Sequence, residues 1–312
     1  MHILLCGSFD DRERNGWLQA LQRAFPAAHW HLSVDPFNAS QIEVAVVANP
    51  PPGSLQGLPR LRLIQSLWAG VDRLMGDASL PAEVPVARMV DPAMNQAMAE
   101  TALWAVLSLH RGFFRYAAQQ RERLWRQWPQ KRADEIQVTV LGLGQMGRTA
   151  AHRLAAQGYR VAGWTAHNGA ADPKIEGLSG QEALHPLLGR SDIVINLLPL
   201  TPLTEGLLDK DFFNAAKPGV ALVNLARGAH VVDADLLDAL QCGQVSHAVL
   251  DVVRQEPLPE DHPYWGHSQV TLLPHIAAIT DMRSAAGVVA ENLAALRDGK
   301  PLANLAHRRF GY

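Results

Sequence analysis

Three polar residues in the second half of the chain each follow an apolar run that predicts a buried strand: Arg227 in NLARG, Glu256 in LDVVRQEP and His275 in LLPHIAA. In open α/β sheets, the carboxyl ends of parallel strands meet at the edge where ligands bind. An arginine there could bind a carboxylate and polarise a carbonyl, and a histidine beside a carboxylate could protonate a developing alkoxide. Reduction of a 2-keto acid requires such groups together with a hydride donor. Each one alone is more typical of a surface ion pair, a solvated loop acid or a strand-end histidine.

A glycine-rich turn is the expected site of the hydride donor. GLGQMG, comprising Gly142, Gly144, Gln145, Met146 and Gly147, directly follows the apolar run IQVTVL and directly precedes a helical stretch. This context predicts dinucleotide binding: the first glycine permits a tight turn, the second lets a pyrophosphate approach the backbone, and the third lets helix and strand pack closely. We therefore predict a nicotinamide cofactor here rather than a turn without a ligand.

The end of the next predicted strand bears on the choice of cofactor. It reads Trp164, Thr165, Ala166, His167 and Asn168, with no carboxylate to hold the ribose hydroxyls or repel a 2′-phosphate. Thr165, His167 and Asn168 could donate hydrogen bonds to such a phosphate, but no arginine is placed to bind it. The sequence permits NAD and slightly favours NADP.

Two series of short apolar runs alternate with helical stretches. The first series lies at 2–6, 29–34, 44–48, 61–67 and 84–88, and the second extends from 136–141 to 270–274. Such alternation predicts an α/β fold with two doubly wound parallel-sheet domains, Rossmann-like or flavodoxin-like, and a cleft between them. A long helix that begins at Asp91-Pro92, with Asp91 as its N-cap, is expected between the two series.

The final helix, expected at about 280–298, follows the last strand and should return to the first domain. We therefore predict a discontinuous substrate-binding domain of residues 1–100 and 281–312, and a dinucleotide-binding domain of residues 101–280. A chain of 312 residues suits two such domains.

Composition narrows the class of protein further. The chain is 48% hydrophobic and 19% charged, with a net charge of −2 and scattered basic residues, which argues against nucleic-acid or acidic-membrane partners. Cys6 and Cys242 match no metal or redox spacing, so we expect no metal. The amino terminus lacks a basic region, and the apolar stretch at 97–109 is too short to span a membrane. We expect a cytoplasmic protein that acts on a small molecule.

The ordered motifs GLGQMG, NLARG, LDVVRQEPLPEDHPYW and LLPHIAAIT resemble those of the D-isomer specific 2-hydroxyacid dehydrogenase family over most of the chain. The resemblance implies that Arg227, Glu256 and His275 form the catalytic set. It also implies that Asp251 contacts the nicotinamide carboxamide. Three further residues are implied to line the cofactor cleft, namely Leu198, Pro199 and Ala226.

The first domain also carries the resemblance. LWAGVD at 67–72 is similar to a family loop in which backbone N–H groups, here of Ala69, Gly70 and Val71, hold the substrate carboxylate. Trp68 replaces a small residue of that loop and either reshapes the substrate pocket or points into the core. The segments 91–100 and 261–280 are similar to those of family members that reduce glyoxylate and hydroxypyruvate. The run from Trp164 to His167 departs from their Trp-Ser-Arg pattern, which leaves NADP preference open.

Three tryptophans have less specific signals. Trp125 and Trp128 are three residues apart and should share a face of a helix predicted over 113–128. In the family this region is a dimer arm, so the resemblance implies a homodimer. Trp265 is either a pocket wall or a core anchor.

Two alternatives accompany this interpretation. β-Hydroxyacid dehydrogenases share the glycine pattern but begin with it, whereas about 140 residues precede it here and no suitable lysine follows. A nicotinamide-binding regulator could use the same fold without significant turnover. Retention of arginine, glutamate and histidine together favours the enzyme over the regulator.

Overall fold

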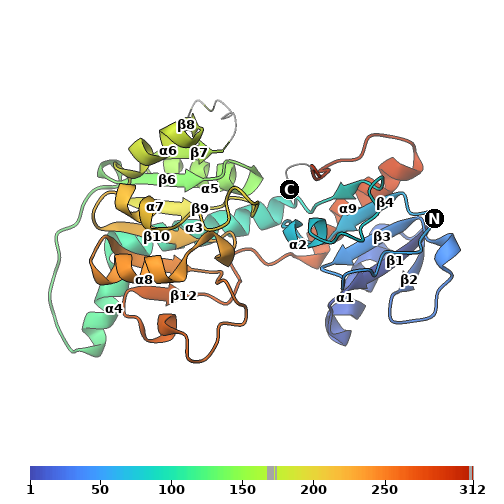
Figure 1. Ribbon diagram of the computed structural model, residues 1–312, viewed down its shortest axis with the longest axis horizontal. Coiled ribbons are helices and arrows are strands. Elements are labelled where there is room, and N and C mark those ends of the chain that lie inside the picture. Colours follow the sequence, from blue (N-terminus) through green and yellow to red (C-terminus); the bar gives the residue numbers. More distant parts are fainter. Residues whose placement is uncertain (167–171, 173, 309–310, 312) are drawn as a thin grey trace. The chain divides into compact units, whose positions relative to one another are not determined.

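The computed structural model describes residues 1–166, 172, 174–308 and 311. The chain forms two compact units, one of residues 1–94 with 280–312 and the other of residues 95–279 (Figure 1). The first unit contains a five-stranded sheet and the second a seven-stranded sheet, and all neighbouring strands in both are parallel. The predicted α/β class with two parallel sheets is confirmed.

Unit 1 has the strand order β2-β1-β3-β4-β5. Its strands are β1 (His2–Gly7), β2 (His29–Leu32), β3 (Val44–Ala48), β4 (Leu63–Ser66) and β5 (Val86–Ala87). Helices α1 (Asp11–Ala24) and α9 (Met282–Arg297) bury apolar side chains against one face, among them Trp17 and Val289. The other face is covered by loop residues and by α2 (Asp72–Met75).

Unit 2 has the strand order β12-β11-β10-β9-β6-β7-β8. Its strands are β6 (Gln137–Leu141), β7 (Arg160–Thr165), β8 (Glu176–Ser179), β9 (Ile193–Asn196), β10 (Val220–Asn224), β11 (Val245–Leu250) and β12 (Val270–Leu272). Because β7 and β9 flank the first strand β6, the order reverses beside β6, and ligands bind at such switch points.

Helices cover both faces of the unit 2 sheet (Figure 1). One face packs against α3 (Pro92–Arg111) and α5 (Gln145–Ala156). The other packs against α6 (Gln181–Leu188), α7 (Lys210–Ala215) and α8 (Asp233–Gln241). The Asp91 carboxylate accepts a hydrogen bond from Ala93 N at 3.0 Å, so the predicted N-cap of α3 is confirmed.

The helix predicted over 113–128 is too long. Helix α4 spans only Phe113–Arg121, and the backbone of Arg123 is left-handed, with φ of 56°. Pro129 also disfavours a helical conformation for the residue before it. Trp125 and Trp128 therefore share no helix face, and that prediction is wrong.

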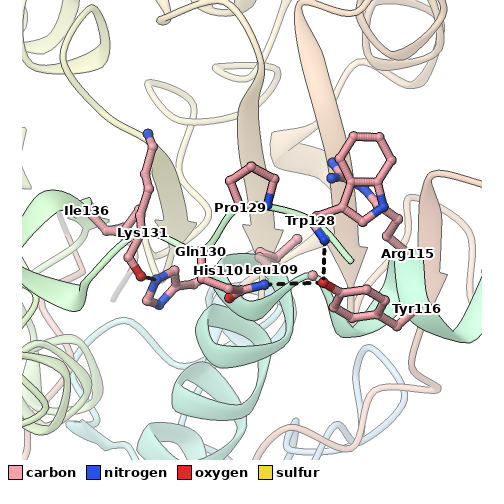
Figure 2. Close-up of a pocket in the computed structure, with 10 residues that line it drawn as sticks. Leu109, His110, Arg115, Tyr116, Trp128, Pro129, Gln130, Lys131 and Ile136 are labelled. Atoms are coloured by element: carbon pink, nitrogen blue, oxygen red, sulfur yellow. Dashed lines mark hydrogen bonds between the residues drawn. The ribbon is translucent and has the colours of Figure 1, made fainter. Parts of the chain in front are cut away.

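Residues 113–132, which we call the arm, close a hollow of about 200 Å³ against the end of α3 (Figure 2). The Tyr116 hydroxyl accepts hydrogen bonds from Trp128 N at 3.1 Å and Gln130 Nε2 at 3.4 Å. The Trp128 ring lies between the guanidinium groups of Arg115 and Arg126. The ring of Trp125, by contrast, is 97% exposed. The arm thus has an internally bonded base and an exposed stretch, 121–127, in which Leu124 and Trp125 are the apolar residues.

Candidate functional site

The three residues expected to do chemistry follow adjacent parallel strands of unit 2. Arg227 follows β10, Glu256 lies in the loop after β11, and His275 follows β12. The sheet order β12-β11-β10 brings these strand ends to one edge.

His275 and Glu256 form a direct pair. Nδ1 of His275 lies 2.8 Å from Oε2 of Glu256, and the side chains are 53% and 38% exposed. The other carboxylate oxygen of Glu256 accepts a hydrogen bond from Val253 N at 3.1 Å, which orients the carboxylate. Because Nδ1 donates to this carboxylate, Nε2 is the ring nitrogen left to exchange a proton with a ligand.

Asp251 holds the backbone on both sides of His275. Its carbonyl oxygen accepts from His275 N at 2.8 Å, and its buried carboxylate accepts from Ile276 N at 2.7 Å and Ala277 N at 3.0 Å. His275 has a left-handed backbone with φ of 55°, a conformation that costs about 1–2 kcal/mol for most side chains. The three bonds to Asp251 therefore keep the imidazole in place against that strain.

The loop that carries Glu256 touches the segment that carries Arg227. A Cβ atom on Gly228 would lie 1.9 Å from the backbone carbon of Val253, so only glycine permits this approach. The Arg227 guanidinium donates to Ala226 O at 2.8 Å through Nη1. The close approach to Val253 thus explains why glycine follows the arginine in NLARG.

Arg254 bridges the same two segments and was missed by the sequence analysis. Its Nη2 donates to Ala229 O at 3.2 Å and Val231 O at 3.0 Å. Nothing in the sequence distinguishes this arginine from a solvated one, because its partners are backbone carbonyls of another loop.

Three buried polar residues at the same edge were also missed, namely Asn196, Asn224 and His230. A signal for two of them was available, because the apolar runs of β9 and β10 both end in asparagine. A fully buried amide at a strand end requires hydrogen-bond partners and so indicates a structured loop beyond it.

The glycine turn joins β6 to α5 and fits a pyrophosphate. A Cβ on Gly142 would lie 2.6 Å from Leu197 O, and one on Gly147 would lie 1.8 Å from Gly142 O, so the fold requires both glycines. A Cβ on Gly144 would meet nothing within 4 Å, and this residue is the N-cap of α5. Open space therefore faces a helix N-terminus, where an anion is stabilised by backbone N–H groups.

The other expected cofactor residues lie at neighbouring strand ends. Thr165 and Ala166 are partly exposed at the end of β7, whereas the Trp164 ring is buried and donates to Gly180 O at 2.8 Å. His167 and Asn168 lie outside the described residues. Three further residues follow β9 and β10: Leu198 and Ala226, which are buried, and Pro199, which is partly exposed.

The expected carboxylate-binding loop lies in unit 1, between β4 and α2. Ala69 and Gly70 are partly exposed and Val71 is buried. The ring of Trp68 packs edge-on against Trp17, with 6.1 Å between ring centroids, in the core of that unit. The structure thus shows Trp68 in a packing contact.

Trp265 is not a core anchor. Its ring is 59% exposed, and Nε1 donates to Pro259 O at 2.9 Å. The neighbouring Tyr264 takes that role, because it is buried and its hydroxyl donates to Asp233 Oδ1 at 2.9 Å. Burial and this carboxylate raise the pKa of Tyr264.

No described helix is long and apolar enough to cross a membrane. No group of three or more histidine, cysteine or acidic side chains in the described part of the chain could hold a metal ion.

Residues 103–277 match the family model described as D-isomer specific 2-hydroxyacid dehydrogenase, NAD binding domain. The chain belongs to the D-isomer specific 2-hydroxyacid dehydrogenase family. The resemblance of its motifs is thereby confirmed, and the family and its relatives indicate an NAD(P)-dependent oxidoreductase.

Relatives within this family match the whole chain. The glyoxylate/hydroxypyruvate reductase A of Serratia proteamaculans is 37% identical over 100% of both chains. The protein of the same name from Yersinia enterocolitica is 34% identical over 96% of this chain and 97% of its own. These names also bear out the predicted similarity to family members that reduce glyoxylate and hydroxypyruvate.

Solved structures of dehydrogenases from this family are similar to this chain over nearly its whole length. A D-isomer specific 2-hydroxyacid dehydrogenase from Xanthobacter autotrophicus, in complex with NADPH and MES, is 36% identical with a TM-score of 0.95, covering 100% of this chain and 99% of that one. An NADPH-dependent glyoxylate/hydroxypyruvate reductase from Sinorhizobium meliloti, in complex with NADP and sulfate, is 30% identical with a TM-score of 0.93 and the same coverage.

Proposed function

We propose that this protein reduces glyoxylate, hydroxypyruvate or similar small 2-keto acids to 2-hydroxy acids with NADPH or NADH. The observation that carries the proposal is the 2.8 Å pair of His275 and Glu256 at the carboxyl edge of the sheet that also bears the glycine turn. The names of the reductases similar to this chain support the substrate class.

Each residue has a separate part in the reaction. The reduced nicotinamide, when bound, supplies a hydride to the keto carbon. His275 donates a proton from Nε2 to the carbonyl oxygen, and the Glu256 carboxylate stabilises the charged imidazole before that transfer. Arg227 binds the substrate carboxylate and polarises the carbonyl. In unit 1, the N–H groups of residues 69–71 are proposed to bind a carboxylate.

The cofactor is proposed to bind along the carboxyl edge of the unit 2 sheet. The turn at 142–147 and the N-terminus of α5 would hold the pyrophosphate. Thr165 and Ala166 would lie near the adenosine ribose, and Leu198, Pro199, Ala226 and Asp251 near the nicotinamide. NADPH or NADP in the structures of similar proteins supports NADP as the preferred cofactor.

An absorbance assay of NADPH and NADH oxidation tests this proposal. We expect turnover with glyoxylate and hydroxypyruvate, faster with NADPH, and less with pyruvate and phenylpyruvate. Glu256→Gln should lower kcat, because the neutral amide stabilises a charged imidazole less well. NADPH binding without turnover of any of these acids would instead favour the regulator.

We further propose that the protein is a cytoplasmic homodimer that pairs through the arm. The exposed apolar side chains of Phe113, Leu124 and Trp125 in the arm support this proposal, because exposed apolar surface favours burial against a partner.

A further inference from the structure

Three polar side chains form hydrogen bonds to the segments proposed to contact cofactor and substrate, namely those of Asn196, Asn224 and His230. Asn196 ends β9, Asn224 ends β10, and His230 ends a short 3-10 helix (Gly228–His230). All three side chains are fully buried, where polar groups cost free energy unless they form hydrogen bonds.

Backbone amides determine how the two asparagines are oriented. Asn196 Oδ1 accepts from Leu198 N at 3.2 Å, and Asn224 Oδ1 accepts from Ala226 N at 3.2 Å. The amide nitrogens must therefore point the other way. Asn196 Nδ2 donates to Asn224 Oδ1 at 3.0 Å, and Asn224 Nδ2 donates to Arg227 O at 3.0 Å.

The ring of His230 contacts Asn196 and two backbone carbonyls. Its Nδ1 lies 3.0 Å from Asn196 Nδ2 and 3.1 Å from Arg227 O. Its Nε2 lies 3.2 Å from Pro199 O and must carry the hydrogen to donate to it.

The bonds from these three side chains thus reach the N–H of Leu198, the carbonyl of Pro199, the N–H of Ala226 and the carbonyl of Arg227. These are the residues that follow β9 and β10 and are proposed above to line the nicotinamide site. We infer that Asn196, Asn224 and His230 are positioning residues that set the spacing between segments 198–199 and 226–227. The inference rests on the proposed function, since it acts through Arg227 and the cofactor.

Substitution of His230 tests the inference. His230→Leu removes both polar ring atoms, and we expect kcat/KM for the keto acid to fall by about 10- to 100-fold, because small misplacements of catalytic groups are this costly. The dissociation constant of NADPH, measured by fluorescence titration, should rise in the same variant. His230→Gln keeps an N–H donor for Pro199 O and should recover most of both losses.

His247→Leu is the matched control. His247 lies in β11 of the same unit, is mostly buried and pairs with Thr271 Oγ1 at 2.9 Å, but it touches neither segment. We expect it to lower the Tm without changing kcat, KM or the NADPH dissociation constant. If His230→Leu did the same, the network would only stabilise the fold and the inference would be wrong.

Nitrogen NMR of the unaltered protein labelled at histidine gives a second test that does not depend on a variant folding. We expect the His230 ring to carry hydrogen at Nε2, because Pro199 O beside it can only accept. A ring without hydrogen at Nε2 would overturn the inference, because Pro199 O would then have no donor. Wild-type protein that turns over no keto acid, while His230→Leu still weakens NADPH binding, would refute the proposed substrate and leave the positioning role standing.

Discussion

The left-handed backbone of His275 affects how its substitution should be tested. Asparagine adopts this conformation more readily than alanine, because its short polar side chain bonds to the local backbone. His275→Asn should therefore remove the proton donor without adding backbone strain. Alanine at this position would combine the chemical loss with a structural one.

We expect His275→Asn to lower kcat by about 10²- to 10⁴-fold, the usual contribution of general acid catalysis. The NADPH dissociation constant and the Tm should stay near those of the wild type. His275→Ala should show the same loss of rate and an added loss of about 1 kcal/mol in the free energy of unfolding. Steady-state kinetics and urea unfolding check both variants, and near-normal turnover by His275→Asn would refute its role as proton donor.

Single residues could be predicted from the sequence where the residue type alone indicates the chemistry. Arg227, Glu256 and His275 each follow an apolar run, and the structure brings His275 and Glu256 to 2.8 Å. The role of Arg254 could not be predicted, because it depends on carbonyls brought near by the approach of Gly228 to Val253. His230 was missed because its partners follow two different strands.

At the scale of elements, the glycines of the turn between β6 and α5 are required for different reasons. Gly142 and Gly147 are required by close contacts within the fold, whereas Gly144 borders open space and has φ of −69°, which any residue adopts. Substitution at these positions should therefore separate folding from cofactor binding.

We expect Gly144→Ala to leave the Tm unchanged and to raise the NADPH dissociation constant at least about tenfold, because a methyl group would occupy the pyrophosphate space. Gly142→Ala is the matched variant and should lower the free energy of unfolding by about 1–3 kcal/mol, since its φ is 96° and Leu197 O is 2.6 Å away. Isothermal titration and thermal unfolding measure the two effects. Undiminished NADPH affinity in Gly144→Ala would argue against a pyrophosphate at this turn.

Elements were predictable where their pattern is strong. The continuous apolar run at 44–48 gave β3 with the bounds of the structure. Strand β8 was not predicted, because its sequence EGLS is mostly exposed and carries no alternation. The predicted helix through the arm was too long because helix-forming residues continue beyond Arg121, while the chain turns at Arg123 and extends toward Pro129.

At the scale of the whole molecule, His247 should make unit 2 sensitive to acid. Burial and the nearby charge of His267 lower the pKa of His247 to about 4, and its ring stacks on Phe114 with centroids 4.6 Å apart. The folded state thus binds a proton at His247 less readily than the unfolded state does. The stability that neutral His247 gives the folded state is therefore fully present above about pH 6.5. It is lost as the pH falls toward 4.

We expect the free energy of unfolding to fall by up to about 3 kcal/mol between pH 7 and pH 4 from this histidine alone. His247→Leu cannot take up the proton and should show a shallower fall over the same range. Urea titrations at several pH values measure both slopes. Equal slopes in the two proteins would show that another group governs acid stability.

The proposed dimer also belongs to this scale. Trp125→Ser removes the most exposed tryptophan of the arm, and we expect it to shift the protein from dimer toward monomer in light scattering after gel filtration. Val34→Ser is the control, because Val34 is an exposed apolar residue of unit 1, outside the arm. A wild-type monomer, or a Trp125→Ser variant that dimerises normally, would refute the arm as the interface.

His275, its carboxylate partner and the backbone groups that hold them all come from unit 2. The loop at 69–71, which is proposed to bind a carboxylate, belongs to unit 1. Replacing unit 1 with that of a relative that prefers another acid should thus change which acids are accepted. The pair of His275 and Glu256 would stay unchanged. The two units can therefore be altered one at a time, in evolution or by engineering.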